Sequence, residues 1–236
     1  MILGNIVQKI TRNFDNKKVI IYKNQKAEVP VIYTNMYTES GNEVLTSCDN
    51  IECAPFHLVT VSNLDWFCDM SPWAHIPVLS NGQSFGGHAD EYMNFMINEL
   101  IPYCRTLLSD ATKDIICGYS MGGLFALYAS YITDAFSNVI CVSGSVWYPD
   151  FLSFAISHEF KRKPDSVYFS LGNRECRTKN SFLCQTENYM IQLKNLYTKQ
   201  SICSAFELNP GNHFKEPSLR LAKGIKWTLD QCMYYL

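Results

Sequence analysis

The sequence predicts an α/β protein with a mostly parallel central sheet and helices on both faces. Two observations lead to this fold class. Short apolar runs alternate with longer amphipathic stretches along the 236 residues, as they do where crossover helices join parallel strands. Neither an internal repeat nor a linker rich in Gly, Ser or Pro divides the chain. We therefore expect a single domain over residues 1–236 that buries a sizeable core.

Seven short runs, many of them rich in β-branched residues, are expected to be strands. In chain order they are Val19–Tyr22, Val29–Tyr33, His57–Val61, Asp114–Cys117, Val139–Ser143, Val167–Leu171 and Ile202–Leu208. The second run contains Pro30, which has no N–H to donate to a neighbouring strand, so we expect it at an edge of the sheet.

Four stretches between these runs have apolar residues at the spacing of one helix face. The apolar positions lie within 93–101, 124–131, 189–197 and 221–232. Asp90 and Glu91 precede the first stretch, and Pro217 precedes the last, as suits the first turn of a helix. These faces are expected to pack on the sheet.

The segment at about 63–87 does not fit a short connection. It contains Pro72, Pro77 and two tryptophans, and it follows a strand in the first half of the sheet. Long loops inside compact domains are usually functional. We expect this one to overhang the carboxyl ends of the strands, where open α/β sheets bind ligands.

The composition excludes several classes of protein. A formal net charge of −2 gives no electrostatic reason to bind nucleic acid or a membrane surface. No run approaches the ~18 apolar residues of a membrane helix. Polar residues such as Asn5 and Lys9 interrupt the N-terminal stretch, so we expect no signal peptide.

Ten cysteines are present, but none has the CxxC spacing of a zinc site. Cys117 and Cys141 lie inside apolar runs, as small core residues do. The chain is too long and too apolar to need a disulfide framework. We expect most of the thiols to be reduced, in a cytoplasmic protein.

Ser120 is the candidate nucleophile. It lies in Gly118-Tyr119-Ser120-Met121-Gly122, a G-x-S-x-G pattern between a predicted strand and a predicted helix. A serine at such a tight turn projects its hydroxyl clear of the sheet, and the helix that follows supplies backbone N–H groups for an oxyanion. The pattern occurs a second time, around Ser84 in residues 82–86. No clear strand precedes Ser84 and glycines delay the next helix, so a flexible loop is expected there.

A serine needs a base to take its proton, and histidine is the usual one. Five histidines are available, at positions 57, 75, 88, 158 and 213. His213 lies between the last strand and the last helix, the position that follows from the chain order Ser, acid, His. His75 and His88 lie in or near the long loop and are candidates for substrate contact.

Glu175 is the candidate acid, because it is the carboxylate between Ser120 and His213 that comes directly after a predicted strand. A salt bridge to Arg174 or Arg177 would explain the same residue without catalysis. A Ser–His dyad that needs no acid also stays open at this point.

Several sequence blocks resemble the putative-esterase family of α/β-hydrolases. This family includes siderophore esterases, feruloyl and acetyl-xylan esterases and S-formylglutathione hydrolases. The blocks are Gly118–Gly123, Ser143–Tyr148, Ser170–Glu175, Gly211–Phe214 and Phe85–Tyr92, and together they fall within residues 55–230. The last block resembles a Gly-Gly segment before a helix, which also argues against Ser84 as nucleophile.

The resemblance implies an α/β-hydrolase fold with Ser120 as nucleophile, His213 as base and Glu175 as acid. It further implies an oxyanion hole formed by the amides of Met121 and Leu64. Trp147 matches an aromatic residue that lines the pocket in similar enzymes, and Trp66 and Arg174 are further candidates for substrate binding.

The sequence differs from part of this family in the charge of one loop. Siderophore-esterase relatives tend to carry arginine in the loop that here reads Leu64–Pro72, which has none. A strongly anionic substrate is therefore less expected, although Arg174, Arg177 and Lys179 would partly compensate.

These observations predict a serine esterase that hydrolyses a small-molecule ester through an acyl-enzyme, without metal or organic cofactor. Thioester cleavage or acyl transfer by the same residues is an alternative. Another is a non-catalytic protein that binds a partner through Trp66, Phe67 and Trp73. The sequence leaves open the acyl and alcohol groups and whether the chain forms a homo-oligomer.

Overall fold

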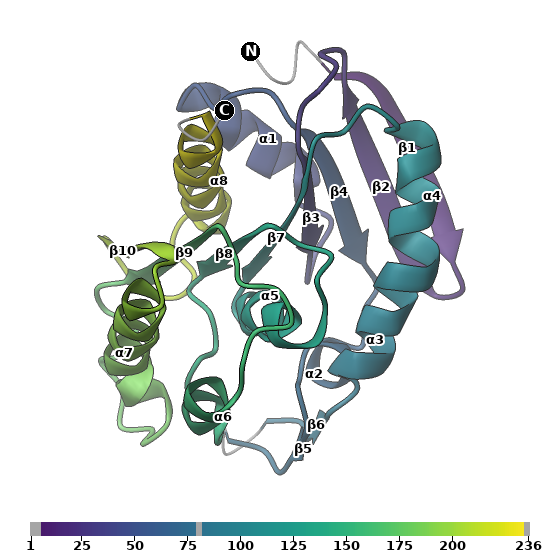
Figure 1. The fold of residues 1–236 in the computed structure, drawn as a ribbon. Coiled ribbons are helices and arrows are strands. Elements are labelled where there is room, and N and C mark those ends of the chain that lie inside the picture. Colours follow the sequence, from purple (N-terminus) through teal and green to yellow (C-terminus); the bar gives the residue numbers. More distant parts are fainter. Residues whose placement is uncertain (1–5, 79–81, 234–236) are drawn as a thin grey trace.

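The computed structural model describes residues 6–78 and 82–233, and an eight-stranded sheet forms its centre (Figure 1). The strand order is β1-β2-β4-β3-β7-β8-β9-β10. The bounds are β1 Ile6–Phe14, β2 Lys17–Asn24, β3 Val31–Asn35, β4 His57–Ser62, β7 Asp114–Tyr119, β8 Asn138–Val142, β9 Ser166–Gly172 and β10 Cys203–Asn209. β1 and β2, and β2 and β4, pair antiparallel, and the later pairs in this order are parallel.

All seven predicted strands are present, with ends within two residues of the predicted ones. β1, which forms a hairpin with β2, was not predicted from the sequence. Phe14 lies opposite Lys17, so Asp15 and Asn16 make a two-residue turn, with Asp15 at a φ of 51°. β1 is an edge strand with largely exposed side chains, and this exposure weakens the apolar pattern by which strands are recognised.

The expectation that Pro30 marks an edge strand was wrong. β3 lies in the middle of the sheet, between β4 and β7. Pro30 directly precedes the first residue of β3, and its carbonyl accepts a hydrogen bond from the His57 amide at 2.9 Å. Because Pro30 contributes an acceptor and no donor is needed there, it does not interrupt the ladder.

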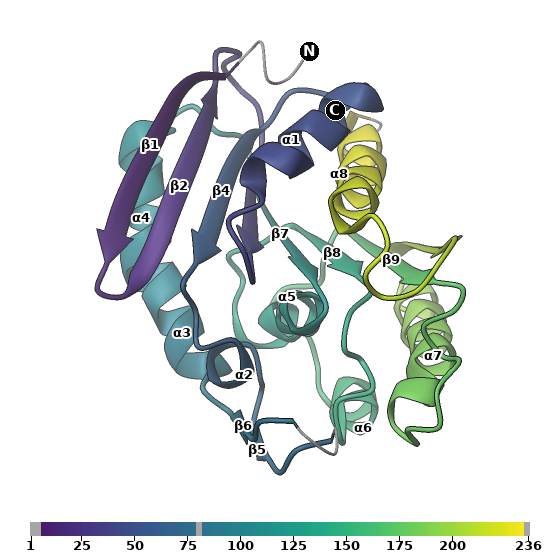
Figure 2. The ribbon, with the colours of Figure 1, turned by 180° about the vertical axis from the view of Figure 1, so that it is seen from behind.

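Helices cover both faces of the sheet, as predicted (Figures 1 and 2). On the face nearest the viewer in Figure 2, α1 (Gly41–Asn50) packs against α8 (Pro217–Met233) over a core that includes Leu45 and Ile225. On the other face a core that includes Leu127 and Leu193 lies beneath a second set of helices. These are α3 Ala89–Phe95, a π-helical segment Met96–Leu100, α4 Ile101–Leu107, α5 Met121–Ile132, α6 Phe151–Ser157 and α7 Thr186–Lys199.

The four predicted helices correspond to α3–α4, α5, α7 and α8, whereas α1 and α6 were not predicted. The predicted long loop contains a short helix, α2 (Trp66–Asp69), and two short paired strands, β5 (Ala74–His75) and β6 (Phe85–Gly86). Part of that loop, 79–81, lies outside the described residues.

The parallel strands all point toward one edge of the sheet, so the segments that follow them meet there. Tyr37 lies shortly after β3, Ser120 follows β7, Ser143 follows β8 and Glu175 follows β9. His213 lies between β10 and α8. The fold thus gathers the candidate residues at the carboxyl edge of the sheet.

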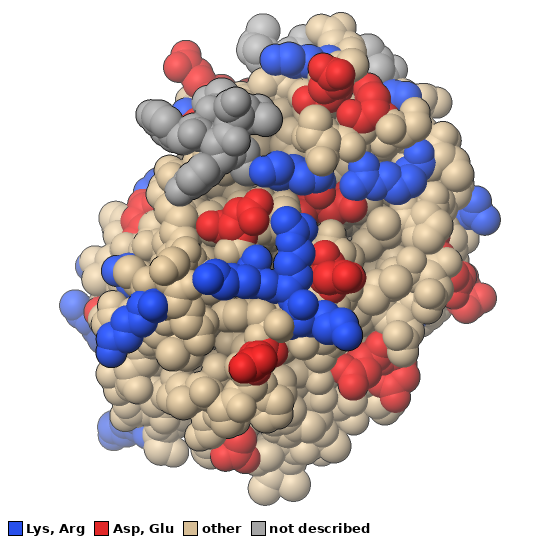
Figure 3. All heavy atoms as spheres, viewed as in Figure 1, with Lys and Arg blue, Asp and Glu red and all other residues tan. Residues whose placement is uncertain are grey.

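Basic and acidic side chains are interspersed on the face of the molecule seen in Figure 3. Within residues 6–78 and 82–233, no helix has the length and apolar character needed to cross a membrane.

Candidate active site

Ser120 stands at a sharp turn between β7 and α5. Its φ and ψ are 58° and −124°, a backbone conformation that non-glycine residues rarely adopt and that costs of order 1–3 kcal/mol. The turn is fixed by hydrogen bonds from the amides of Gly123 and Ser145 to the Ser120 carbonyl, both at 3.0 Å. Such strain is expected where a nucleophile is presented from a strand-to-helix turn.

Close packing in this turn requires the first glycine of the motif and leaves little room at the second. A Cβ atom on Gly118 would lie 2.0 Å from the Gly122 carbonyl oxygen, which is backbone and cannot rotate away. A Cβ atom on Gly122 would lie 3.2 Å from the Trp66 ring. The strand and helix can therefore approach each other this closely only with glycine at position 118.

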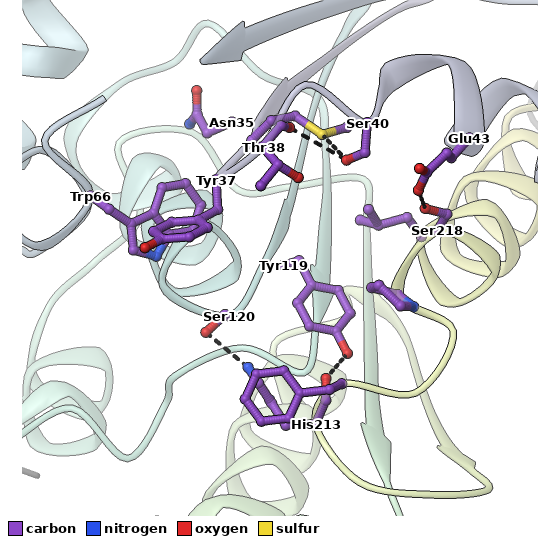
Figure 4. Close-up of a pocket in the computed structure, with 14 residues that line it drawn as sticks. Asn35, Tyr37, Thr38, Ser40, Glu43, Trp66, Tyr119, Ser120, His213 and Ser218 are labelled. Atoms are coloured by element: carbon purple, nitrogen blue, oxygen red, sulfur yellow. Dashed lines mark hydrogen bonds between the residues drawn. The ribbon is translucent and has the colours of Figure 1, made fainter. Parts of the chain in front are cut away.

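His213 lies beside Ser120, although 93 residues separate them. The distance from His213 Nε2 to Ser120 Oγ is 3.1 Å, within hydrogen-bond reach (Figure 4). The tyrosine next to the serine helps to hold the histidine loop, because the Tyr119 hydroxyl donates to the His213 carbonyl at 2.6 Å.

Glu175 completes a chain of three side chains. Its Oε2 lies 2.7 Å from His213 Nδ1, and its carboxylate side chain is only 7% exposed. The Gly172 amide and the Ser143 hydroxyl donate to the other oxygen, Oε1, at 2.6 and 2.8 Å. Burial alone would raise the pKa of Glu175, but the His213 contact and these donors outweigh it and lower the pKa. The group is thus held as a carboxylate beside the imidazole.

Arg220, which the sequence analysis did not single out, ties the acid to the histidine loop. Its side chain is 2% exposed, and Nη1 donates to Glu175 Oε1 at 2.9 Å. Nη2 donates to the carbonyls of Pro210 and Asn212, at 3.1 and 2.9 Å. An arginine in the first turn of a helix is usually exposed, so no local pattern in the sequence indicates this role.

Two cavities of about 350 Å³ each meet at Ser120. We call them the Glu43 cavity and the Trp147 cavity. The Glu43 cavity is lined by Met36, Thr38, Ser40, Glu43, Ser218 and Leu221, among others. The Trp147 cavity is lined by Phe67, Val78, Phe85, Met121, Trp147 and Leu183, among others. Both share Tyr37, Trp66, Ser120, His213 and Phe214.

The residues predicted to bind substrate lie in different places. Trp66 borders both cavities, and Trp147 borders one of them. Arg174 is exposed and lines neither, and the same holds for Arg177 and Lys179. The two tryptophans thus line cavities that reach Ser120, whereas the arginine does not.

Leu64 and Met121 were predicted to supply the oxyanion hole. Met121 is the first residue of α5, next to Ser120. Leu64 follows β4, and β3 separates β4 from the strand that carries Ser120. Leu64 lines neither cavity, whereas Tyr37, from the segment after β3, lines both. The placement of Tyr37 depends on the order of the strands in the sheet, which no local sequence pattern reveals.

The second candidate serine and three of the other histidines lie elsewhere in the structure. Ser84 is exposed and directly precedes the two-residue strand β6 rather than a helix. His57 is buried at the opposite edge of the sheet, where its Nδ1 accepts from the Asn24 amide at 3.1 Å. The His158 ring stacks on Phe154, and His88 immediately precedes α3.

The nine described cysteines are all free thiols. Among the described residues, no group of three or more His, Cys, Asp or Glu side chains is arranged to hold a metal ion.

Similar folds occur in solved structures of hydrolases. Siderophore hydrolase EstB from Aspergillus nidulans has a TM-score of 0.73 at 17% identity, and the match covers 92% of this chain and 93% of that one. An IroE-like serine hydrolase from Shewanella oneidensis has a TM-score of 0.76 at 16% identity, over 94% and 80%. At such identities the likeness shows the fold alone. The protein has the α/β-hydrolase fold.

The family follows from the sequence. The model of the family described as "Putative esterase" matches residues 37–198, more than half of the chain. The chain therefore belongs to the putative esterase family, which confirms the resemblance seen in its motifs and supports ester hydrolysis. A curated relative, the uncharacterized protein YbbA from Bacillus subtilis (strain 168), is 23% identical over 168 residues, 67% of each chain.

Proposed function

We propose that the protein is a serine carboxylic-ester hydrolase that acts through an acyl-enzyme. One observation carries this proposal: Ser120 Oγ, the His213 ring and the Glu175 carboxylate form a continuous chain with contacts of 3.1 and 2.7 Å. This is the arrangement in which an imidazole accepts the serine proton while a carboxylate orients the ring. The Glu175 contact favours a triad over a Ser–His dyad.

The reaction would proceed in two halves. Ser120 Oγ attacks the ester carbonyl carbon while His213 Nε2 takes its proton. The tetrahedral intermediate then collapses, the ester C–O bond breaks, and His213 returns the proton to the departing alcohol oxygen. In the second half His213 takes a proton from water while the water oxygen attacks the acyl carbon. The bond from that carbon to Ser120 Oγ then breaks, His213 returns the proton to Oγ, and the acid leaves.

The oxyanion would be held by the backbone amides of Met121 and Tyr37. Met121 stands at the N-terminus of α5, where amides point away from the helix without intrahelical partners. We propose Tyr37 in place of Leu64, because Tyr37 follows the strand beside β7 and lines both cavities that reach Ser120. One such donor typically stabilises the transition state by about 3 kcal/mol.

We also propose that Glu175 and Arg220 act together to place the base. The carboxylate orients the imidazole through Nδ1, and the guanidinium fixes both the carboxylate and the loop that carries His213. The free thiols of the described cysteines are compatible with the predicted cytoplasmic location, which we keep as part of the proposal.

A kinetic comparison of variants tests the proposal. Ser120→Ala and His213→Ala are expected to lower kcat/KM for 4-nitrophenyl esters by roughly 10⁴-fold or more, since the residues of a triad act as a unit. Ser84→Ala, the matched control from the second G-x-S-x-G, should retain full activity. Full activity of Ser120→Ala would refute the proposal, and loss confined to Ser84→Ala would mean that the other serine is the nucleophile.

A further inference from the structure

The two cavities beside Ser120 carry information about the substrate. Each has a volume of about 350 Å³, within the range of pockets that hold a small organic ligand. Because both reach the nucleophile, an ester bound there can extend a large group on each side of its carbonyl. A chain with only one such cavity would favour a small acyl or a small alcohol group.

The residues shared by the two cavities include two exposed aromatic side chains. Tyr37 is 72% exposed and Phe214 is 83% exposed, and both line both cavities. Tyr37 packs edge-on against Trp66 (Figure 4). Phe214 packs edge-on against His213. Large exposed apolar side chains grouped around a concave site indicate a binding surface rather than a solvated one.

The charges that face the cavities are few and negative. The described residues that line the two cavities include two carboxylates, Glu43 and Glu175, and one histidine, His213. They include no Lys or Arg. The buried Arg220 is already bound to Glu175 and two carbonyls.

Glu43 stands at the far side of its cavity from Trp66, with Ser218 donating to its Oε2 at 3.2 Å (Figure 4). An anionic group in either cavity would lose water without meeting a cation, and in the Glu43 cavity it would also meet a negative charge. Uncharged groups incur neither cost, and the aromatic walls favour them.

We propose that the substrate is an uncharged ester with a bulky group on both the acyl and the alcohol side, and that Glu43 is a specificity-determining residue that disfavours anions in one half. This inference rests on the proposed esterase function. It limits the proposed esterase to uncharged esters and excludes strongly anionic ones.

Two matched series of esters test the inference. In the alcohol series, butanoate esters of benzyl alcohol carry a 4-isopropyl or a 4-carboxylate group. In the acyl series, methyl 3-phenylpropanoates carry the same two groups on the ring. Isopropyl and carboxylate are similar in size, so the ratio of kcat/KM values for the pair reports the effect of charge.

For the wild-type protein, we expect the carboxylate ester to be at least tenfold poorer than the isopropyl ester in both series. Glu43→Gln should raise the carboxylate-to-isopropyl ratio by about fivefold in one series only, because Glu43 lines only one cavity. Trp147→Ala should lower kcat/KM for the isopropyl ester mainly in the other series. Glu99→Gln, an exposed glutamate outside both cavities, should change neither ratio.

Equal hydrolysis of the carboxylate and isopropyl esters by the wild-type protein would overturn the inference and leave the esterase proposal standing. An unchanged ratio in Glu43→Gln would overturn the role of Glu43. Failure to hydrolyse any ester, together with no reaction of Ser120 with a fluorophosphonate, would instead refute the esterase function and the inference with it.

Discussion

The same five-residue pattern occurs twice in this chain with different structural results. Residues 118–122 form a strained turn between a buried strand and a buried helix, with Ser120 at a φ of 58°. Residues 82–86 lead into a two-residue strand, and Ser84 is exposed. The difference lies in what flanks the motif, so a G-x-S-x-G indicates a nucleophile only when a strand precedes it and a helix follows it.

The largest expected effect comes from a substitution of Arg220, which holds the residues that contact Ser120. Arg220→Met should lower the free energy of unfolding by about 3 kcal/mol, because it leaves the buried Glu175 carboxylate without its cation. It should also lower kcat for 4-nitrophenyl esters by roughly tenfold to a hundredfold, since the His213 loop loses two hydrogen bonds. Urea unfolding and steady-state kinetics measure the two effects.

Arg174→Met is the matched control for that substitution. Arg174 is exposed, so stability should change by less than about 0.5 kcal/mol and activity should persist. Wild-type kcat in Arg220→Met would show that the guanidinium does not position the base.

The glycines of the two segments allow a direct comparison of backbone packing. Gly118→Ala would place a Cβ 2.0 Å from the backbone oxygen of Gly122, whereas Gly86→Ala would meet the side chain of Cys68, at 2.5 Å from Sγ. Rotation can move Cys68 Sγ aside but not its Cβ, which would lie 2.8 Å from the new atom, whereas no rotation relieves the contact at Gly118. We therefore expect a loss of about 3 kcal/mol for the first variant and about 2 kcal/mol for the second. Equal shifts in thermal midpoint would contradict this reading of the motif.

The smallest effect concerns pH. The pKa of Glu175 is lowered in the folded protein, so its ionised form stabilises the fold at pH values above the ordinary glutamate pKa. That contribution is lost as the pH falls through the lowered pKa. Glu175→Gln should therefore flatten the dependence of the unfolding free energy on pH as the pH falls below the ordinary glutamate pKa. Parallel curves for wild type and Glu175→Gln would contradict the pKa shift.

Much of the fold could be predicted because the sequence patterns that indicate its strands and helices are local. Buried strands are short runs of β-branched residues, and the helices on them show a one-sided apolar face. Ser120, Glu175 and His213 were found as candidates for the same reason, since each directly follows a predicted strand or lies between a strand and a helix.

The remaining features depend on which strands are neighbours. Pro30 was taken as a sign of an edge strand, yet it stands just outside β3, where no donor is required. The resemblance pointed to Leu64, in the loop after the third predicted strand, for the oxyanion hole. The strand order, with β3 rather than β4 beside β7, is the reason that we propose Tyr37 instead. Arg220 gains its role only through contacts with residues 45 positions and 8 to 10 positions away.

Covalent labelling of the protein with a fluorophosphonate, followed by mass spectrometry of its peptides, decides whether Ser120 is the activated nucleophile. We expect one adduct, on Ser120, that forms quickly in the wild-type protein and only slowly in His213→Ala. An adduct on Ser84, or no adduct on any serine of the folded protein, would contradict it.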